Sequence, residues 1–288
     1  MAINQKVFKT RAITAVVFVA VMLCGLLVNE WTFSLLFFII HWGCWSEFDP
    51  LIKKIIPAYG EADLRITSLP RLIGSGFLIY CIPHQYSIYN VAIDFIGILI
   101  MVVGTIKFLS LWIRAGAMRP LLLKVALLGL LYISLSWGLM IHLRFCYFLT
   151  YPLGWVVALT LVGAVWINDT MQYIVGSLIG KTPFSKISPN KTLEGTIGGS
   201  LLCIAVVTAI GYYFVAPDMI WMFLIVSATA AVIGTLGDLV ESKFKRLAGV
   251  KDSGHFMPGH GGFLDRFDSL ILATPFVVLI MTFAFGLR

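Results

Sequence analysis

Carboxylates that are able to bind a cation gather in the last third of this chain. Eight of its 14 Asp and Glu residues fall between positions 169 and 268. Asp238 and Glu241 are three residues apart, so they share one face if their segment is helical. Asp265 and Asp268 have the same spacing. Carboxylates at two helix ends suit Mg²⁺, which takes oxygen ligands and keeps positions for water and phosphate. The pattern predicts a cation site for phosphate chemistry.

Basic and small residues accompany these carboxylates. Ser242 and Lys245 continue the same helix face, and Arg246 and Arg266 lie nearby in the sequence. Lys and Arg side chains suit phosphate groups, and the glycines within 259–262 let the backbone approach a ligand closely. The alternative is that the carboxylates only cap helices and form surface ion pairs. That alternative explains single residues better than it explains the whole cluster.

A second polar group precedes this one. Asp169 lies inside an otherwise apolar segment, which is a costly placement that usually marks function in membrane proteins. Asn168 beside it offers an oxygen ligand or a hydrogen-bonding partner. The loop at 185–195 carries Ser, Lys, Thr and Gly residues around Pro189, but it is not a Walker A motif. It suits phosphate binding, and the alternative is an ordinary basic cytosolic loop.

The elements that position these residues are predicted to be membrane helices. The 288 residues are 59% hydrophobic and 12% charged with a mean hydropathy of +0.95, whereas soluble domains carry about 25% charged residues. Apolar runs close to the ~20 residues that cross a bilayer recur along the chain. We therefore expect an all-α, polytopic transmembrane protein of about nine helices, at 12–28, 31–48, 71–89, 91–113, 121–141, 151–175, 197–215, 219–240 and 268–286.

The basic residues predict the orientation. With nine spans and a cytosolic N-terminus, 19 of the 21 Lys and Arg residues fall on the cytosolic side, and only Arg144 and Arg288 fall outside. This is the bias that the positive-inside rule describes. The basic residues lie in short loops rather than in a stripe with interleaved aromatics, so the net charge of +7 does not predict nucleic-acid binding. Both polar groups described above then face the cytosol.

The second half of the chain carries two motifs: Ser188-Pro189-x-Lys191-Thr192-x-Glu194-Gly195, and Ser242-x-Phe244-Lys245-Arg246-x4-Lys251-Asp252-x-Gly254-x3-Pro258-x-His260-Gly261-Gly262-x2-Asp265-Arg266-x-Asp268. Asp169 and the stretch from Gly234 through Gly237 and Asp238 to Ser242 accompany them. On these residues, the chain over about residues 165–275 resembles the phosphatidate cytidylyltransferases, also called CDP-diacylglycerol synthases. One departure is Thr170-Met171-Gln172, which replaces the small residues common after the aspartate that matches Asp169.

The resemblance implies a function and a division of the chain. Members of the family it resembles are dimeric enzymes that require Mg²⁺. They transfer CMP from CTP to phosphatidic acid, giving CDP-diacylglycerol and pyrophosphate. We expect residues 1–150 to form about five N-terminal transmembrane helices. Residues 151–288 then form a transmembrane catalytic region with signature loops at 181–196 and 241–268. The resemblance also implies a homodimer. The distribution of the basic residues places the active site on the cytosolic side, and we expect the protein in the plasma (inner) membrane.

The resemblance also implies residue roles. It associates Asp238 and Asp265 with the metal, a second cation being left open. Expected catalytic residues are Asp238, Asp265, Asp268, Lys245 and Arg266. Expected substrate-binding residues are Asp169, Ser188, Lys191, Thr192, Glu194, Glu241, Ser242, Arg246, Lys251, Asp252, His260, Gly261 and Gly262.

The sequence leaves two alternative functions open. A related CTP-dependent polyprenol kinase would transfer the terminal phosphate and release CDP instead of pyrophosphate. An ion or phosphate transporter would use Asp169 and the helix-end carboxylates to line a pathway. The chain has no internal repeat of the kind that marks many transporters, and its acidic residues gather at one face.

Overall fold

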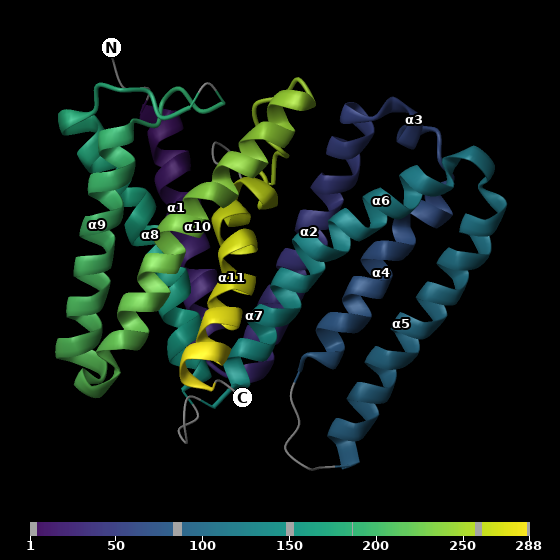
Figure 1. Cartoon of the computed structure of the whole chain (residues 1–288), viewed down its shortest axis with the longest axis horizontal. Helices are drawn as coiled ribbons and strands as arrows, with labels where there is room; N and C mark the ends of the chain where they lie inside the picture. The colour runs from purple at the N-terminus through teal and green to yellow at the C-terminus, as the bar shows by residue number, and fades with distance from the viewer. Residues whose placement is uncertain (1–4, 83–87, 148–152, 186, 257–260, 287–288) are drawn as a thin grey trace. The chain divides into compact units, whose positions relative to one another are not determined.

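A computed structural model describes residues 5–82, 88–147, 153–185, 187–256 and 261–286 of the chain, with side chains placed from residue 13 onward except at 88–90. The described residues form helices and loops, and their one β-type contact is an isolated bridge between Pro183 and Thr192. This confirms the predicted all-α class. Helices satisfy their own backbone hydrogen bonds, which a chain buried in lipid requires. Figure 1 labels the helices α1 to α11.

The chain divides into two compact units. Unit 1 comprises Met1–His142 and Leu247–Phe267, and unit 2 comprises Leu143–Arg246 and Asp268–Arg288. Residues of the second signature loop therefore occur in both units. The predicted division at residue 150 stays a prediction.

Unit 1 contains the N-terminal helices. In chain order they are α1 (Gln5–Leu27), α2 (Glu30–Ile55), α3 (Pro57–Gly60), α4 (Leu64–Tyr80), α5 (Ile88–Arg114), η1 (Gly116–Met118), α6 (Arg119–Gly129), η2 (Leu130–Ser134) and α7 (Leu135–Phe145), the last of which continues into unit 2.

Local signals explain where α2 and α4 begin. Asn29 accepts a hydrogen bond from the backbone N–H of Thr32 at 2.9 Å, which caps α2, and Asp63 caps α4 in the same way.

The helices α4 and α5 pack closely at two glycines. A β-carbon at Gly76 of α4 would lie 2.8 Å from the carbonyl oxygen of Gly97 on α5. Small residues at this contact let the two backbones approach closely, as is common between membrane helices.

Unit 2 contains the remaining helices and most of the motif residues. They are α8 (Gly154–Ile179), α9 (Leu193–Ile210), η3 (Gly211–Val215), η4 (Pro217–Met219), α10 (Ile220–Leu247) and α11 (Phe263–Phe285). The last residue of α10 and the first five residues of α11 belong to unit 1. Two glycines bring these helices together. Gly199 of α9 meets the backbone of Gln172 on α8, and a β-carbon at Gly237 of α10 would lie 2.5 Å from the carbonyl oxygen of Asp268 on α11. Larger side chains at either position would separate the helices.

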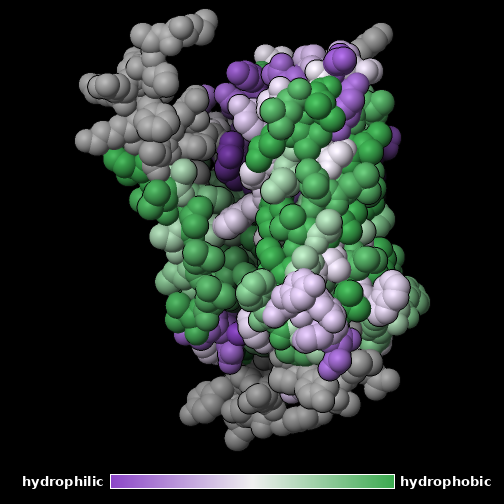
Figure 2. Space-filling view, turned by 90° about the vertical axis from the view of Figure 1, so that its left-hand side faces the viewer, coloured by the Kyte–Doolittle hydropathy of each residue, from purple (hydrophilic) through white to green (hydrophobic). Residues whose placement is uncertain are grey.

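Six helical segments of the described residues are long and apolar enough to cross a membrane. They are Val91–Arg114, Gly116–Phe145, Gly154–Ile179, Leu193–Val215, Pro217–Leu247 and Phe263–Phe285. The predicted number of nine is not confirmed. Among the other predicted spans, 12–28 contains only the shorter apolar helix Ile13–Leu27. The span 31–48 lies within α2, and the span 71–89 is helical at 71–80 and 88–89, but neither joins the six. Figure 2 shows a broad hydrophobic area over the middle of one face, with hydrophilic side chains gathered toward its ends.

Candidate active site

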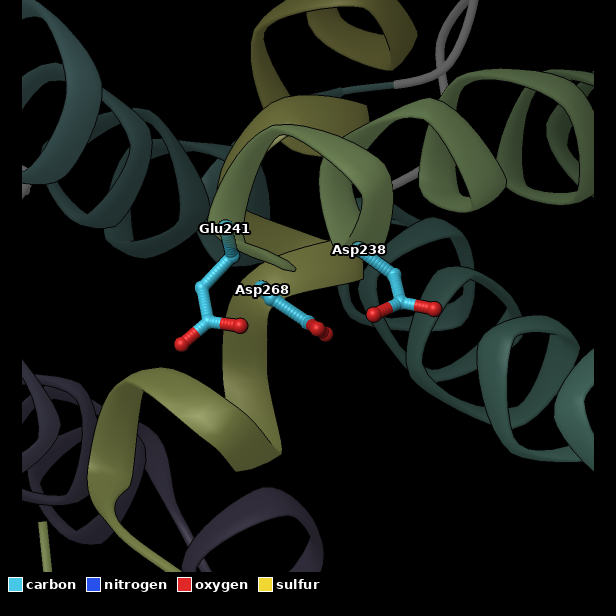
Figure 3. A group of neighbouring side chains, drawn as sticks. All are labelled: Asp238, Glu241 and Asp268. Atoms are coloured by element: carbon cyan, nitrogen blue, oxygen red, sulfur yellow. The ribbon is translucent and has the colours of Figure 1, made fainter. Parts of the chain in front are cut away.

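Three carboxylates come together where α10 packs on α11. Oxygen atoms of Asp238, Glu241 and Asp268 all lie within 4.8 Å of one another. Asp238 and Glu241 extend from one side of α10, and Asp268 from α11 lies between them (Figure 3). The close approach at Gly237 brings the two helices into this position. Three hard oxygen ligands at this separation fit a divalent cation such as Mg²⁺.

Two lysines balance part of this negative charge. Lys191, from the loop before α9, forms an ion pair with Asp238, and Lys245 forms one with Glu241 at 2.5 Å, four residues further along α10. The Glu241 side chain is only 1% exposed, so its charge is held away from bulk water. Ser242 donates a hydrogen bond to Asp238 at 3.3 Å. The structure thus brings the two clusters predicted from sequence together at Asp238 through Lys191.

A buried polar network lies between α8, α9 and α10. Gln172 donates to the hydroxyl of Thr235 at 2.8 Å, and Asn168 donates to the same oxygen at 3.4 Å. Ser200 donates to Asn168 at 3.3 Å. The hydroxyl of Thr235 in turn donates to the carbonyl of Ala231 at 2.7 Å. Polar side chains that bond across helices in this way fix the helices relative to one another.

The first signature loop is closed by its own hydrogen bonds. Glu194, in the first turn of α9, accepts bonds from the backbone N–H of Lys181 at 3.1 Å and from the hydroxyl of Thr182 at 2.8 Å. Thr192 caps α9 by accepting from the N–H of Gly195 at 3.1 Å. The backbone N–H of Phe184 donates to the carbonyl of Lys191 at 2.8 Å. Glu194 and Thr192 therefore shape the loop that presents Lys191, and Ser188 lies in that loop, half-buried.

Asp265 occupies a different environment from Asp238. Its Oδ2 accepts hydrogen bonds from the backbone N–H of Gly262 at 2.8 Å and of Ser253 at 2.9 Å, all within unit 1. Gly261 has a φ of +84°, a conformation that glycine adopts without strain. The cluster that the structure assembles in unit 2 pairs Asp238 with Glu241 and Asp268, so the predicted pairing of Asp238 with Asp265 at the metal stays a prediction.

Other predicted site residues are exposed on their elements. These are Asp169, Arg246, Lys251, Asp252 and Arg266. His260 lies outside the described residues. Exposed charged groups are accessible to a substrate, and their predicted roles remain predictions.

Four residues that bear on the site were not singled out from the sequence. Thr235 and Ser200 look like ordinary small residues of apolar helices, and Gln172 stands out in the sequence only as a departure from the family pattern. A signal existed for Gln172, since an amide in an apolar helix is costly. Glu47 carried the same signal in α2, where it is buried with 9% of its surface exposed.

Comparison with known proteins identifies the family of the chain. A phosphatidate cytidylyltransferase of Staphylococcus haemolyticus (strain JCSC1435) is 50% identical over 119 residues, and one of Staphylococcus aureus (strain COL) is 49% identical over 119 residues. Each alignment covers 41% of this chain and 45% of the relative, so the matched part spans less than half of the curated relatives. A model described as the cytidylyltransferase family matches residues 9–284, and the chain therefore belongs to the cytidylyltransferase family.

Proposed function

We propose that this protein is a phosphatidate cytidylyltransferase, which converts CTP and phosphatidic acid to CDP-diacylglycerol and pyrophosphate. The observation that carries the proposal is the cluster of Asp238, Glu241 and Asp268, with Lys191 and Lys245 paired to it. It combines ligands for a cation with cationic groups for phosphate. Family membership and the similarity to two staphylococcal proteins of that name support the same reaction.

The proposed reaction needs positioning and charge neutralisation more than proton transfer. A phosphate oxygen of phosphatidic acid attacks the α-phosphorus of CTP, and the bond to the bridging oxygen between the α- and β-phosphates breaks. The electron pair leaves with pyrophosphate, and the CMP unit becomes joined to the lipid phosphate. Since the nucleophile is already an anion, catalysis rests on orienting two anions and stabilising the leaving group. Lys191 and Lys245 are placed to supply positive charge for this purpose.

The carboxylate cluster fits Mg²⁺ by the chemistry and spacing of its oxygen atoms. Asp238, Glu241 and Asp268 would hold the ion, which when bound neutralises phosphate charge and stabilises the departing pyrophosphate. Asp265 is an additional ligand in the proposal, on the strength of the family resemblance. A second cation remains part of the proposal for the same reason.

The membrane setting suits one soluble and one lipid substrate. We propose nine spans with the N-terminus in the cytosol, which places the signature loops at the cytosolic surface of the plasma (inner) membrane. CTP then arrives from the cytosol, and the phosphate of phosphatidic acid lies at the headgroup level. The protein acts as a homodimer in this proposal, as the resemblance implies.

Product analysis tests the proposed function. Purified protein is incubated with CTP, Mg²⁺ and vesicles that contain phosphatidic acid, and the lipids are analysed by mass spectrometry. We expect CDP-diacylglycerol and an equal amount of pyrophosphate, both of which disappear when phosphatidic acid is left out. Release of CDP, or a phosphorylated polyprenol formed when polyprenol replaces phosphatidic acid, would identify a kinase instead.

A further inference from the structure

A buried glutamate of the N-terminal half binds the second signature loop. Glu47 of α2 exposes only 9% of its surface. Its Oε1 accepts a hydrogen bond from the backbone N–H of Phe263 at 2.8 Å, and its Oε2 accepts one from that of Leu264 at 3.0 Å. The hydroxyl of Ser253 lies 2.7 Å from the same Oε2. All of these residues belong to unit 1.

These contacts place Glu47 at the beginning of α11. The first N–H groups of a helix have no partner within the helix, and a carboxylate there also interacts favourably with the helix dipole. Phe263 and Leu264 are the first two residues of α11, so Glu47 caps this helix from a distant part of the chain. The cap fixes where α11 begins and, with it, the placement of the aspartate two residues after Phe263.

Ser253 connects Glu47 to that aspartate. Its hydroxyl lies 2.7 Å from Glu47 Oε2 and 3.0 Å from Asp265 Oδ2, and its backbone N–H donates to Asp265 at 2.9 Å. A hydroxyl has one proton, so it donates to one of the two carboxylates at a time. Glu47, Ser253 and Asp265 thus form one chain of polar contacts.

The position of Glu47 also accounts for two glycines of the signature. A β-carbon added at Gly254 or at Gly262 would collide with the carboxylate of Glu47. Both glycines lie so close to this carboxylate that a larger residue at either position would displace it. The glycines and Glu47 form one arrangement, although Glu47 lies more than 200 residues away in the sequence.

We propose that Glu47 is a positioning residue for cytidylyl transfer: it holds the second signature loop and the start of α11 so that Asp265 is oriented for Mg²⁺ and substrate. This inference rests on the proposed function and on the predicted role of Asp265. Glu47 acts through Ser253, Phe263 and Leu264 and does not itself touch the substrate.

The substitution Glu47→Gln tests this proposal. It keeps the size of the side chain but replaces one accepting oxygen with an NH₂ group, which meets a donor where an acceptor is needed. We expect the Mg²⁺ concentration for half-maximal activity to rise about tenfold. We also expect faster hydrogen–deuterium exchange in peptides covering 253–256 and 261–266. Loss of folded protein alone would lower the maximal rate without moving the Mg²⁺ requirement.

Ser253→Ala and Glu30→Gln complete the experiment. Ser253→Ala removes only the shared hydroxyl, and we expect it to raise the Mg²⁺ requirement about threefold. In the double variant with Glu47→Gln, we expect the Mg²⁺ requirement to rise by less than the product of the two single increases. Glu30 is exposed in the first turn of the same helix, so Glu30→Gln should match the wild type. If Glu47→Gln does not fold, Ser253→Ala carries the test.

Two results separate the inference from the proposed function. Wild-type Mg²⁺ dependence and wild-type exchange in both variants would overturn the positioning role, while the wild type still makes CDP-diacylglycerol. If the wild type makes no CDP-diacylglycerol, the proposed function fails. In that case, unchanged exchange in Glu47→Gln would overturn the structural part of the inference as well.

Discussion

Gly237 faces the backbone of Asp268 so closely that a β-carbon there would lie 2.5 Å from the Asp268 carbonyl oxygen. This contact joins α10 to α11 one residue before Asp238 and so sets the separation of the carboxylates in Figure 3. The site depends on a packing detail of two membrane helices as much as on its charged side chains.

Gly237→Ala should therefore damage the site through packing. Forcing a methyl group into a tight contact costs about 1–3 kcal/mol, and relaxation here moves the carboxylates apart. We expect at least a tenfold loss of activity together with a lower melting temperature in detergent. Gly163→Ala on α8 is the matched control, since nothing lies within 4 Å of a β-carbon there, and it should leave both quantities unchanged. Full activity of Gly237→Ala would contradict the packing account.

Asp268→Asn should weaken cation binding. The substitution keeps the shape of the side chain but removes a charge from the cluster with Asp238 and Glu241. We expect a Mg²⁺ requirement raised at least tenfold and a maximal rate lowered by a factor of 100 or more. Titration of activity with MgCl₂ measures both effects. Asp218→Asn, at an exposed position in η4, should behave as the wild type. An unchanged Mg²⁺ titration for Asp268→Asn would remove this residue from the cation site.

Lys191→Ala should impair the use of CTP. Lys191 supplies a positive charge next to Asp238, from a loop that Glu194 holds in shape. We expect kcat/KM for CTP to fall by a factor of 30 or more, because a charge near the phosphates is lost. Lys243→Ala is the control, since Lys243 is exposed on α10 next to the site residue Ser242. Equal losses in both variants would indicate a general charge effect rather than a role of Lys191.

Thr235→Val should lower stability through the buried network. The hydroxyl of Thr235 accepts from Gln172 and Asn168, so its removal leaves buried amide donors without that acceptor. A lost partner of this kind costs about 1–3 kcal/mol. Thermal unfolding in detergent should show a lower midpoint. Thr282→Val is the control. The hydroxyl of Thr282, like that of Thr235, donates to the carbonyl four residues earlier in its helix, but Thr282 is exposed. Equal unfolding midpoints of the two variants would show that the network does not stabilise the protein.

The helical class and part of the site could be predicted from local patterns. The spacing of Asp238 and Glu241 predicts a shared helix face, and both do lie in one carboxylate cluster. The partnership of Asp268 with them depends on how α10 packs on α11, which no spacing within one helix specifies. The same holds for Glu47, whose partners Phe263 and Leu264 lie on a helix at the other end of the chain.

The membrane spans show a similar limit. Hydropathy predicts the six long apolar segments well, because each contains a stretch of 18 residues with a high mean hydropathy and few charged residues. In α2 the buried His41 and Glu47 lower the mean hydropathy of the apolar run, and this helix is not among the six. Buried polar residues that form structural contacts thus lower the mean hydropathy by which a membrane-spanning helix is recognised.

The position of the transferred label tests the central claim most directly. The purified protein is given phosphatidic acid and Mg²⁺ with CTP labelled either at the α-phosphate or at the γ-phosphate. Cytidylyl transfer predicts that the α-label enters the lipid and that the γ-label appears only in pyrophosphate. A γ-label in the lipid, or no label in the lipid from either CTP, would contradict the assignment of this protein as a phosphatidate cytidylyltransferase.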